Sequence, residues 1–476
     1  MAAVHLLLNG EPRAIDNVAP TTTVLDWLRG SARLTGTKEG CAEGDCGACT
    51  VVLGRSGNGT LRYEAVNSCL MVVPQLDGAA LFTVEGLAEK GGTLHPVQQA
   101  LVDTEGTQCG FCTPGFVMAM FAFQQGGEEP SETRIHDALA GNLCRCTGYR
   151  AIVDVCRRVA PRSGHDDETK RATVAGLRQL PEAVEYRHGA QVFLAPRSLD
   201  ALLKARASHP DALLLSGGTD LGLRVSKERE AWPLVISTAA VAELKRVAST
   251  GGILEIGAGA TYTDALPHLD EHFPAFAALV RRIGSRQIRN LGTFAGNLAT
   301  ASPIGDTLPC LVALAAQVVL RSQKGERILA VEDFITGYRK IALAADEIIA
   351  AIRIPLLAPN THFAAYKLSK RFDQDISTLV AAFALTLANG KVDALRAVYG
   401  GMAARPARAA ALEAALADRP WTGQSLADVD MLIARDFSPM SDHRGSAVYR
   451  LRAAAALVRR LHLETTETIP VRLETL

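Results

Sequence analysis

The placement of the cysteines constrains this chain more than any other feature of its sequence. Eight of the ten cysteines lie before residue 150 and form two groups of four. The first cysteine group is Cys41, Cys46, Cys49 and Cys69, and the second is Cys109, Cys112, Cys144 and Cys146. The N-terminal segment has no basic region ahead of an apolar run, so we expect a cytoplasmic protein. Because thiols stay reduced in that compartment, the groups predict metal sites rather than disulfides.

The first cysteine group has the spacing C-x4-C-x2-C, and nineteen further residues separate Cys49 from the fourth cysteine. We expect its first three members on a glycine-rich loop between a short helix, capped by Thr23, and a strand that begins with residues 49–53. This spacing is typical of the plant-type [2Fe–2S] site. Gly40, Gly44 and Gly47 allow the backbone to turn its N–H groups toward the sulfurs. A zinc site stays open as the alternative.

The second cysteine group has the spacing C-x2-C and then C-x-C. An apolar helical pattern follows each pair, and the N–H groups at a helix start favour an anionic ligand. Two further helices are predicted at residues 95–104 and 131–141. With the helices that follow the two cysteine pairs, they predict a four-helix bundle. His95 and His136 are interpreted as capping or packing residues. Cys156 and Cys310 are interpreted as small buried apolar residues.

The second half of the chain has glycine-rich turns in place of cysteines. A polar stretch, 161–176, predicts an exposed linker. Neither G-x-G-x-x-G nor a P-loop is present, so a Rossmann dinucleotide site is not indicated. The turns after 215 and 292 instead suit an anion-binding nest of backbone N–H groups, although each alone is more typical of a simple turn. Thr219, Thr293 and Asn297 add donors, and Asp306 could accept ribose hydroxyls, which together suits a pyrophosphate-containing cofactor.

The motifs "GTKEGCAEGDCGACTV", "QCGFCTPG" and "GNLCRCTGYR" together resemble the N-terminal region of the molybdenum hydroxylases, the xanthine dehydrogenase and aldehyde oxidase group. The resemblance implies an α+β multidomain chain with two [2Fe–2S] clusters, one in a β-grasp ferredoxin domain (1–88) and one in a helical bundle domain (89–160). In that family the second cluster lies nearest the molybdenum cofactor, and Gln108 matches the position whose amide reaches the pterin.

The segments "SGGTDLG", "RNLGTFAGNLATASPIGD" and "DEIIAAIRIP" are similar to the FAD domain of xanthine dehydrogenases and CO dehydrogenase flavoproteins. This resemblance implies a linker (161–185), an FAD-binding domain (186–358) and a C-terminal α+β lobe (362–476). It places charged residues 366–377 near the flavin edge. The implied FAD contacts are Leu214, Leu215, Ser216, Gly217, Gly218, Thr219, Asp220, Leu221, Ile283, Thr293, Phe294, Ala295, Gly296, Asn297, Asp306, Ile349 and Lys367. Asp220 replaces a Glu of some relatives, and Ile283 stands where an aromatic is common.

The resemblance implies an electron-transfer chain with no acid, base or nucleophile of its own. We expect no molybdopterin region within it, so a large partner chain would hold the molybdenum. This arrangement resembles the small subunits of bacterial members of the xanthine dehydrogenase family. It implies hypoxanthine and xanthine oxidation to urate on the partner, NAD⁺ reduction by FAD, and two small with two large chains. Oxidation of an aldehyde or another N-heterocycle, O₂ as acceptor, and a zinc-stabilised interaction module stay open as alternatives.

Overall fold

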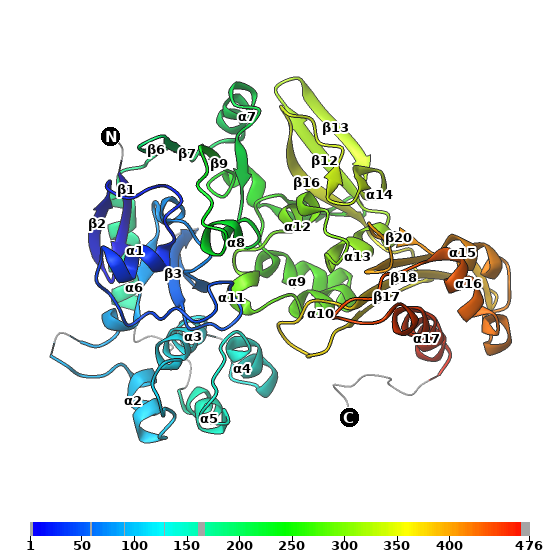
Figure 1. Ribbon diagram of the computed structural model, residues 1–476, viewed down its shortest axis with the longest axis horizontal. Helices are drawn as coiled ribbons and strands as arrows, with labels where there is room; N and C mark the ends of the chain where they lie inside the picture. Colours follow the sequence, from blue (N-terminus) through cyan, green and yellow to red (C-terminus); the bar gives the residue numbers. More distant parts are fainter. Residues whose placement is uncertain (1–2, 58–59, 90, 128, 160–166, 468–476) are drawn as a thin grey trace. The chain divides into compact units, whose positions relative to one another are not determined.

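The computed structural model describes residues 3–57, 60–89, 91–127, 129–159 and 167–467, and the chain divides into two compact units (Figure 1). Unit 1 comprises Met1–Val241 and Gly284–Gly292, and unit 2 comprises Ala242–Ile283 and Thr293–Leu476. In the described ranges, no helix has the length and apolar character needed to cross a membrane.

Unit 1 begins with a five-stranded sheet that packs against one short helix, as expected of a β-grasp domain. The strands in spatial order are β2 (Glu11–Ile15), β1 (Val4–Leu8), β5 (Ala80–Phe82), β3 (Thr50–Gly57) and β4 (Thr60–Asn67). The β1–β2 hairpin turns at Asn9 and Gly10, which have φ of 51° and 88°. Thr23 caps α1 (Val24–Gly30) by accepting a hydrogen bond from the Asp26 N–H at 3.0 Å, as its sequence predicts.

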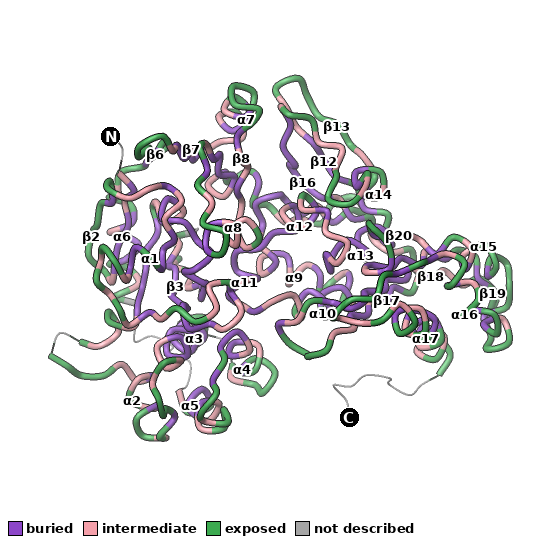
Figure 2. Tube along the Cα trace, in the orientation of Figure 1, coloured by how far each residue is buried: buried purple, intermediate pink, exposed green. Residues whose placement is uncertain are grey.

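Four helices follow as the predicted bundle. They are α2 (Pro96–Asp103), α3 (Thr113–Gln125), α4 (Glu132–Leu139) and α5 (Arg150–Arg158). Figure 2 shows that α3 is buried along most of its length, and it packs in one core with Val97, Ile135 and Ile152. His95 caps α2 by accepting from the Val97 N–H, and Cys156 is 1 % exposed, so both interpretations are confirmed.

The predicted linker differs in part from the structure. Residues 161–166 lie outside the described residues, whereas the rest of the polar stretch belongs to α6 (Asp167–Gln179). Val174 and Leu177 are buried, and Leu177 joins a core with Leu7 and Val52 of the first sheet. The prediction of an exposed connector is wrong for this part, because two apolar residues three apart suffice to anchor one helix face.

The last part of unit 1 is a four-stranded sheet with its helices. Its elements are β6 (Glu185–His188), β7 (Gln191–Leu194), β9 (Leu234–Ser237), β8 (Leu213–Leu215), α7 (Leu199–Ser208) and α8 (Leu221–Ser226). The four-residue helix α11 (Arg286–Arg289) belongs to unit 1 although its neighbours in sequence belong to unit 2.

Unit 2 has two antiparallel sheets and two cores. The first sheet runs β10 (Val247–Thr250), β11 (Ile253–Gly257), β16 (Ile348–Pro355), β12 (Gln317–Ser322) and β13 (Gly325–Ala330). Its helices and a small hairpin are α9 (Tyr262–His272), α10 (Pro274–Arg281), α12 (Phe294–Thr300), α13 (Thr307–Ala313), α14 (Val331–Phe334), β14 (Ile335–Gly337) and β15 (Lys340–Ile341).

The second sheet forms the C-terminal lobe, with its own core. It runs β17 (Thr361–Leu368), β18 (Leu379–Ala388), β19 (Lys391–Gly400) and β20 (Ala407–Arg408). It packs with α15 (Ala410–Leu416), α16 (Val429–Asp436) and α17 (Ala447–Thr466). Arg450 on α17 is 2 % exposed, donates to the Thr378 carbonyl at 3.1 Å and pairs with Asp442 at 2.9 Å. These contacts join α17 to the start of β18 within the lobe.

Candidate iron–sulfur and flavin sites

The first cysteine group is assembled as two pairs of sulfurs. The loop between α1 and β3 brings Cys41 beside Cys46. The sulfur atoms of Cys49 and Cys69 are 3.3 Å apart. Cys49 and Cys69 are buried with Leu25 and Leu70, while Cys41 and Cys46 are partly exposed. All four cysteines are free thiols.

Backbone N–H groups surround the first pair, as the glycine pattern predicts. The sulfur of Cys41 accepts from the N–H groups of Glu43, Asp45 and Cys46 at 3.3–3.4 Å. The hydrogen bond with Cys46 and these N–H groups outweigh burial and lower the pKa of Cys41 to about 5. A thiolate, the form that binds metal, is therefore favoured at this position. Gly44 has a φ of +78°, a backbone conformation that favours glycine.

The second cysteine group is also assembled in pairs. The sulfurs of Cys109 and Cys146 are 3.6 Å apart, and Cys112 is hydrogen-bonded to Cys144. Cys112 directly precedes α3, and Cys146 precedes α5 by one turn. Cys109 and Cys146 are exposed, whereas Cys144 is buried. Burial and the partner Cys144 raise the pKa of Cys112 to about 12.

The donor sets of both groups fit a [2Fe–2S] cluster. Each cluster has two irons, and each iron needs two thiolate ligands in addition to the bridging sulfides. Each cysteine group supplies two pairs of sulfurs, one pair for each iron. A zinc ion needs four ligands around one point. Among the residues that the structure describes, no three or more His, Cys, Asp or Glu side chains are gathered to hold a single metal ion.

Helix α8 holds the first cysteine loop through contacts that the sequence did not predict. The Ser226 hydroxyl donates to the Ala42 carbonyl at 2.7 Å, and Lys227 Nζ donates to the Cys41 carbonyl at 2.7 Å. Gly222 is required because a Cβ there would lie 2.2 Å from the Leu70 carbonyl. The ligand loop is therefore fixed by a helix almost two hundred residues away in sequence.

Helix α11 links the two cysteine groups. Gln287 is fully buried, and its Nε2 donates to Asn142 Oδ1 at 2.8 Å and lies 3.3 Å from Thr50 Oγ1. Asn142 in turn donates to the Gly47 carbonyl at 3.0 Å. Arg289 pairs with Asp137 on α4. Thr50 directly follows Cys49, and Asn142 precedes Cys144 by two residues, so Gln287 connects segments that carry ligands of both groups. No short-range pattern identifies Gln287.

The predicted flavin contacts Leu214–Leu221 lie in unit 1, at the end of β8 and the start of α8. Gly217 approaches other backbone so closely that a Cβ would lie 1.7 Å from the Leu291 carbonyl, and Gly218 has a φ of +81°. Gln75 Nε2 lies 3.4 Å from the carbonyl oxygens of both Ser216 and Gly217. The turn is thus held in a shape that only glycine allows, as an anion nest requires.

The remaining predicted contacts lie in unit 2. Thr293 caps α12 and accepts from the Gly296 N–H at 2.9 Å, so its side-chain oxygen already has a donor. Asn297 Oδ1 accepts from the Thr307 hydroxyl at 2.6 Å. Ile349 is 8 % exposed within the main core, and the half-buried Ile283 packs against that core.

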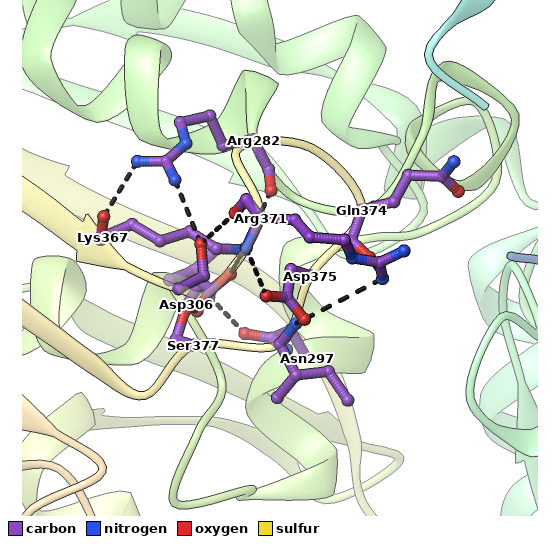
Figure 3. Close-up of polar contacts among 12 residues, drawn as sticks. Arg282, Asn297, Asp306, Lys367, Arg371, Gln374, Asp375 and Ser377 are labelled. Atoms are coloured by element: carbon purple, nitrogen blue, oxygen red, sulfur yellow. Dashed lines mark hydrogen bonds and ion pairs between the residues drawn. The ribbon is translucent and has the colours of Figure 1, made fainter. Parts of the chain in front are cut away.

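A buried ion pair joins Asp306 to Lys367 (Figure 3). Lys367 Nζ lies 2.7 Å from Asp306 Oδ2 and donates to the Arg282 carbonyl at 2.9 Å. Ser377 donates to the other Asp306 oxygen at 2.5 Å. Both carboxylate oxygens are therefore engaged by protein groups, which favours a role for Asp306 in fixing Lys367. Lys367 itself lies within β17 and is buried, while the loop after it is exposed.

Arg282 organises that exposed loop. It donates to the Lys367 carbonyl at 2.9 Å and to Ser369, and it stacks over the ring of Phe372 at 4.5 Å. Arg371 bonds the Gln374 carbonyl at 2.7 Å. The charged segment is thus an ordered loop built around two arginines.

Four family models match successive parts of the chain. They are described as "2Fe-2S iron-sulfur cluster binding domain" (6–73), "[2Fe-2S] binding domain" (83–157), "FAD binding domain in molybdopterin dehydrogenase" (185–357) and "CO dehydrogenase flavoprotein C-terminal domain" (364–465). Two [2Fe–2S] binding domains and an FAD-binding domain are therefore present, which overturns the alternative of a zinc-stabilised interaction module.

Curated relatives and solved structures agree with these matches. Xanthine dehydrogenase of Emericella nidulans is 32 % identical over 98 % of this chain and 39 % of the relative. Xanthine dehydrogenase/oxidase of Mus musculus is 31 % identical over 93 % of this chain and 37 % of the relative. The chain therefore spans less than two fifths of the length of these relatives.

Among solved structures, quinoline 2-oxidoreductase from Pseudomonas putida 86 has a TM-score of 0.54 and 26 % identity, over 58 % of this chain and 97 % of that one. Carbon monoxide dehydrogenase from Hydrogenophaga pseudoflava has a TM-score of 0.53 and 29 % identity, over 56 % of this chain and 94 % of that one. In both cases the matched chain corresponds to little more than half of this one.

Proposed function

Because the chain belongs to the molybdenum hydroxylase family, as an iron–sulfur and FAD module, we propose that it is the electron-transfer small subunit of a xanthine dehydrogenase. A molybdopterin-binding partner subunit would oxidise hypoxanthine to xanthine and xanthine to urate. The observation that carries the proposal is the pairing of eight cysteines in two groups, in a chain that aligns with xanthine dehydrogenases over 98 % and 93 % of its length.

The chain's own residues hold and orient the redox groups. When bound, each [2Fe–2S] cluster carries one electron at a time, and FAD converts single electrons to the two that a hydride needs. The second cysteine group exposes Cys109 and Cys146, and Gln108 beside them is also exposed. This face is the entry point that we assign to electrons from the partner's molybdopterin. Two small and two large chains, in the cytoplasm, complete the proposed enzyme.

NAD⁺ is the proposed electron acceptor. The loop that follows Lys367 carries Lys370 and Arg371, and Arg282 lies at its base. Cationic side chains on an exposed loop attract the anionic pyrophosphate of a dinucleotide. O₂ needs no such charge.

A second candidate keeps the same electron path with another substrate on the partner. The likeness to quinoline 2-oxidoreductase and to carbon monoxide dehydrogenase, at 26 % and 29 % identity, favours this alternative. An aldehyde or another N-heterocycle would then replace the purine.

The test uses the complex purified from its own host through a tag on this chain. Xanthine added without air should bleach the visible flavin and cluster bands, and NAD⁺ added next should restore them with formation of NADH. Cys112→Ser should prevent xanthine from bleaching the flavin, whereas Cys156→Ala, in the same bundle, should not. Bleaching by quinoline or an aldehyde but not by xanthine would replace the substrate and keep the electron path.

A further inference from the structure

The residues between Cys144 and α5 form a closed set of hydrogen bonds around one cluster ligand. The Thr147 hydroxyl donates to the Cys144 sulfur at 3.2 Å. The Tyr149 N–H donates to Thr147 Oγ1 at 3.2 Å, and the Cys144 N–H donates to the Tyr149 hydroxyl at 2.9 Å. Tyr149 adopts a φ of +68°, which a non-glycine residue adopts only where its surroundings require it.

This geometry sets the direction of the hydrogen bond to the sulfur. An iron-bound thiolate has no proton, so it can only accept. The Tyr149 N–H donates to one lone pair of the Thr147 oxygen, so the hydroxyl proton points away from Tyr149 and toward Cys144. The hydrogen bond is therefore oriented by the backbone rather than left to rotate freely.

We propose that Thr147 is a positioning residue that raises the reduction potential of the second cluster through its hydrogen bond to Cys144. Reduction adds one electron to the cluster and makes no new bond, so the negative charge on the ligand sulfurs grows. A hydrogen bond to a more negative sulfur is stronger, and the reduced state is therefore stabilised more than the oxidised state.

The position of Cys144 makes this bond effective. Cys144 is 9 % exposed, while Cys109 and Cys146 are exposed and can be hydrogen-bonded by water. In the poorly solvated half of the site, one fixed donor acts with less screening.

The proposal concerns the chain's own cluster site and does not depend on which substrate the partner oxidises. It is tested by redox titration of the purified complex with dithionite, following each cluster by electron paramagnetic resonance. Cys109→Ser, which changes a ligand of the second cluster alone, identifies the signal of that cluster. Thr113→Val is the matched control, because Thr113 directly follows the ligand Cys112 but its hydroxyl bonds Thr107 at 2.6 Å.

Thr147→Val should lower the ratio of reduced to oxidised second cluster about tenfold at a fixed potential, which corresponds to about 59 mV for one electron. Thr147→Ser keeps a hydroxyl and should retain most of the wild-type reduction potential of the second cluster. Thr113→Val should leave that potential unchanged. The proposal is overturned by an unchanged potential in Thr147→Val with full iron content, or by an equal shift in Thr113→Val. Loss of the second cluster in both Thr147 variants would also overturn it, since Thr147 would then serve assembly.

Discussion

At the scale of single residues, the buried pair Asp306–Lys367 makes the sharpest stability prediction. Lys367→Met leaves the Asp306 carboxylate in the core with only Ser377 as its partner. Removing one member of a buried ion pair costs about 3–5 kcal/mol, so we expect a lower melting temperature and a reduced FAD content. Thermal unfolding and the flavin absorbance of the purified protein measure both.

Lys370→Met is the control for that substitution. Lys370 is exposed and bonds only a backbone carbonyl, that of His443, at 2.6 Å, so its loss should change the melting temperature little. Equal destabilisation by the two variants would contradict the role assigned to the Asp306–Lys367 pair.

Residues differ in how far their roles could be predicted. The eight cysteines were identifiable because a ligand set carries its chemistry in residue type and spacing. Asp306 was named as a candidate acceptor of ribose hydroxyls, and Lys367 was identified only through resemblance. The ion pair between them was not predicted, since nothing local brings together residues sixty-one positions apart. Gln287 and Thr147 were missed, because a glutamine or threonine acquires a role only from the group that the fold places beside it.

At the scale of elements, the four-residue helix α11 is expected to stabilise the link between the two cysteine groups. Gln287→Leu removes the donor to Asn142 and Thr50 and leaves the Asn142 side-chain oxygen buried without this partner. An unsatisfied buried polar group costs about 1–3 kcal/mol. We therefore expect faster hydrogen exchange at the Leu143 N–H, which donates to the Cys46 carbonyl at 2.9 Å between the two cysteine groups.

Gln99→Leu gives the comparison for that prediction. It removes an exposed hydrogen bond to Asp103 within one helix, so exchange at Leu143 should stay at its original rate. If the Leu143 N–H also exchanged at its original rate in Gln287→Leu, α11 would not stabilise the link between the cysteine groups.

The elements show where local patterns suffice and where they do not. The hairpin at Asn9 and Gly10, α1 and the four bundle helices were predictable, because their caps, turns and periodicity are local. Helix α6 was predicted as an exposed linker, since its charged residues outnumber the few apolar ones that anchor it. The four-residue α11 is too short for any periodic signal, and its contacts decide its place.

At the scale of the whole molecule, the chain crosses from unit 2 into unit 1 and back within nine residues, Gly284–Gly292. These residues contact the cluster domains through Gln287, Arg289 and Asn290, whose Nδ2 donates to the Ala65 carbonyl at 2.9 Å. Cluster binding contributes folding free energy where the ligands lie. Removing iron should therefore loosen unit 1 and this insertion together.

Hydrogen exchange with and without iron tests this on the full chain. After treatment with a chelator and reductant, peptides covering 284–292 should lose protection together with 41–69 and 109–146. The flanking helices α10 and α12, which pack in the main core of unit 2, should keep theirs. Retained protection at 284–292, or equal loss in α10 and α12, would contradict the division into two units. The insertion thus makes the stability of the cluster domains depend on residues coded within the FAD-binding region, a coupling that a tandem order of independent domains would lack.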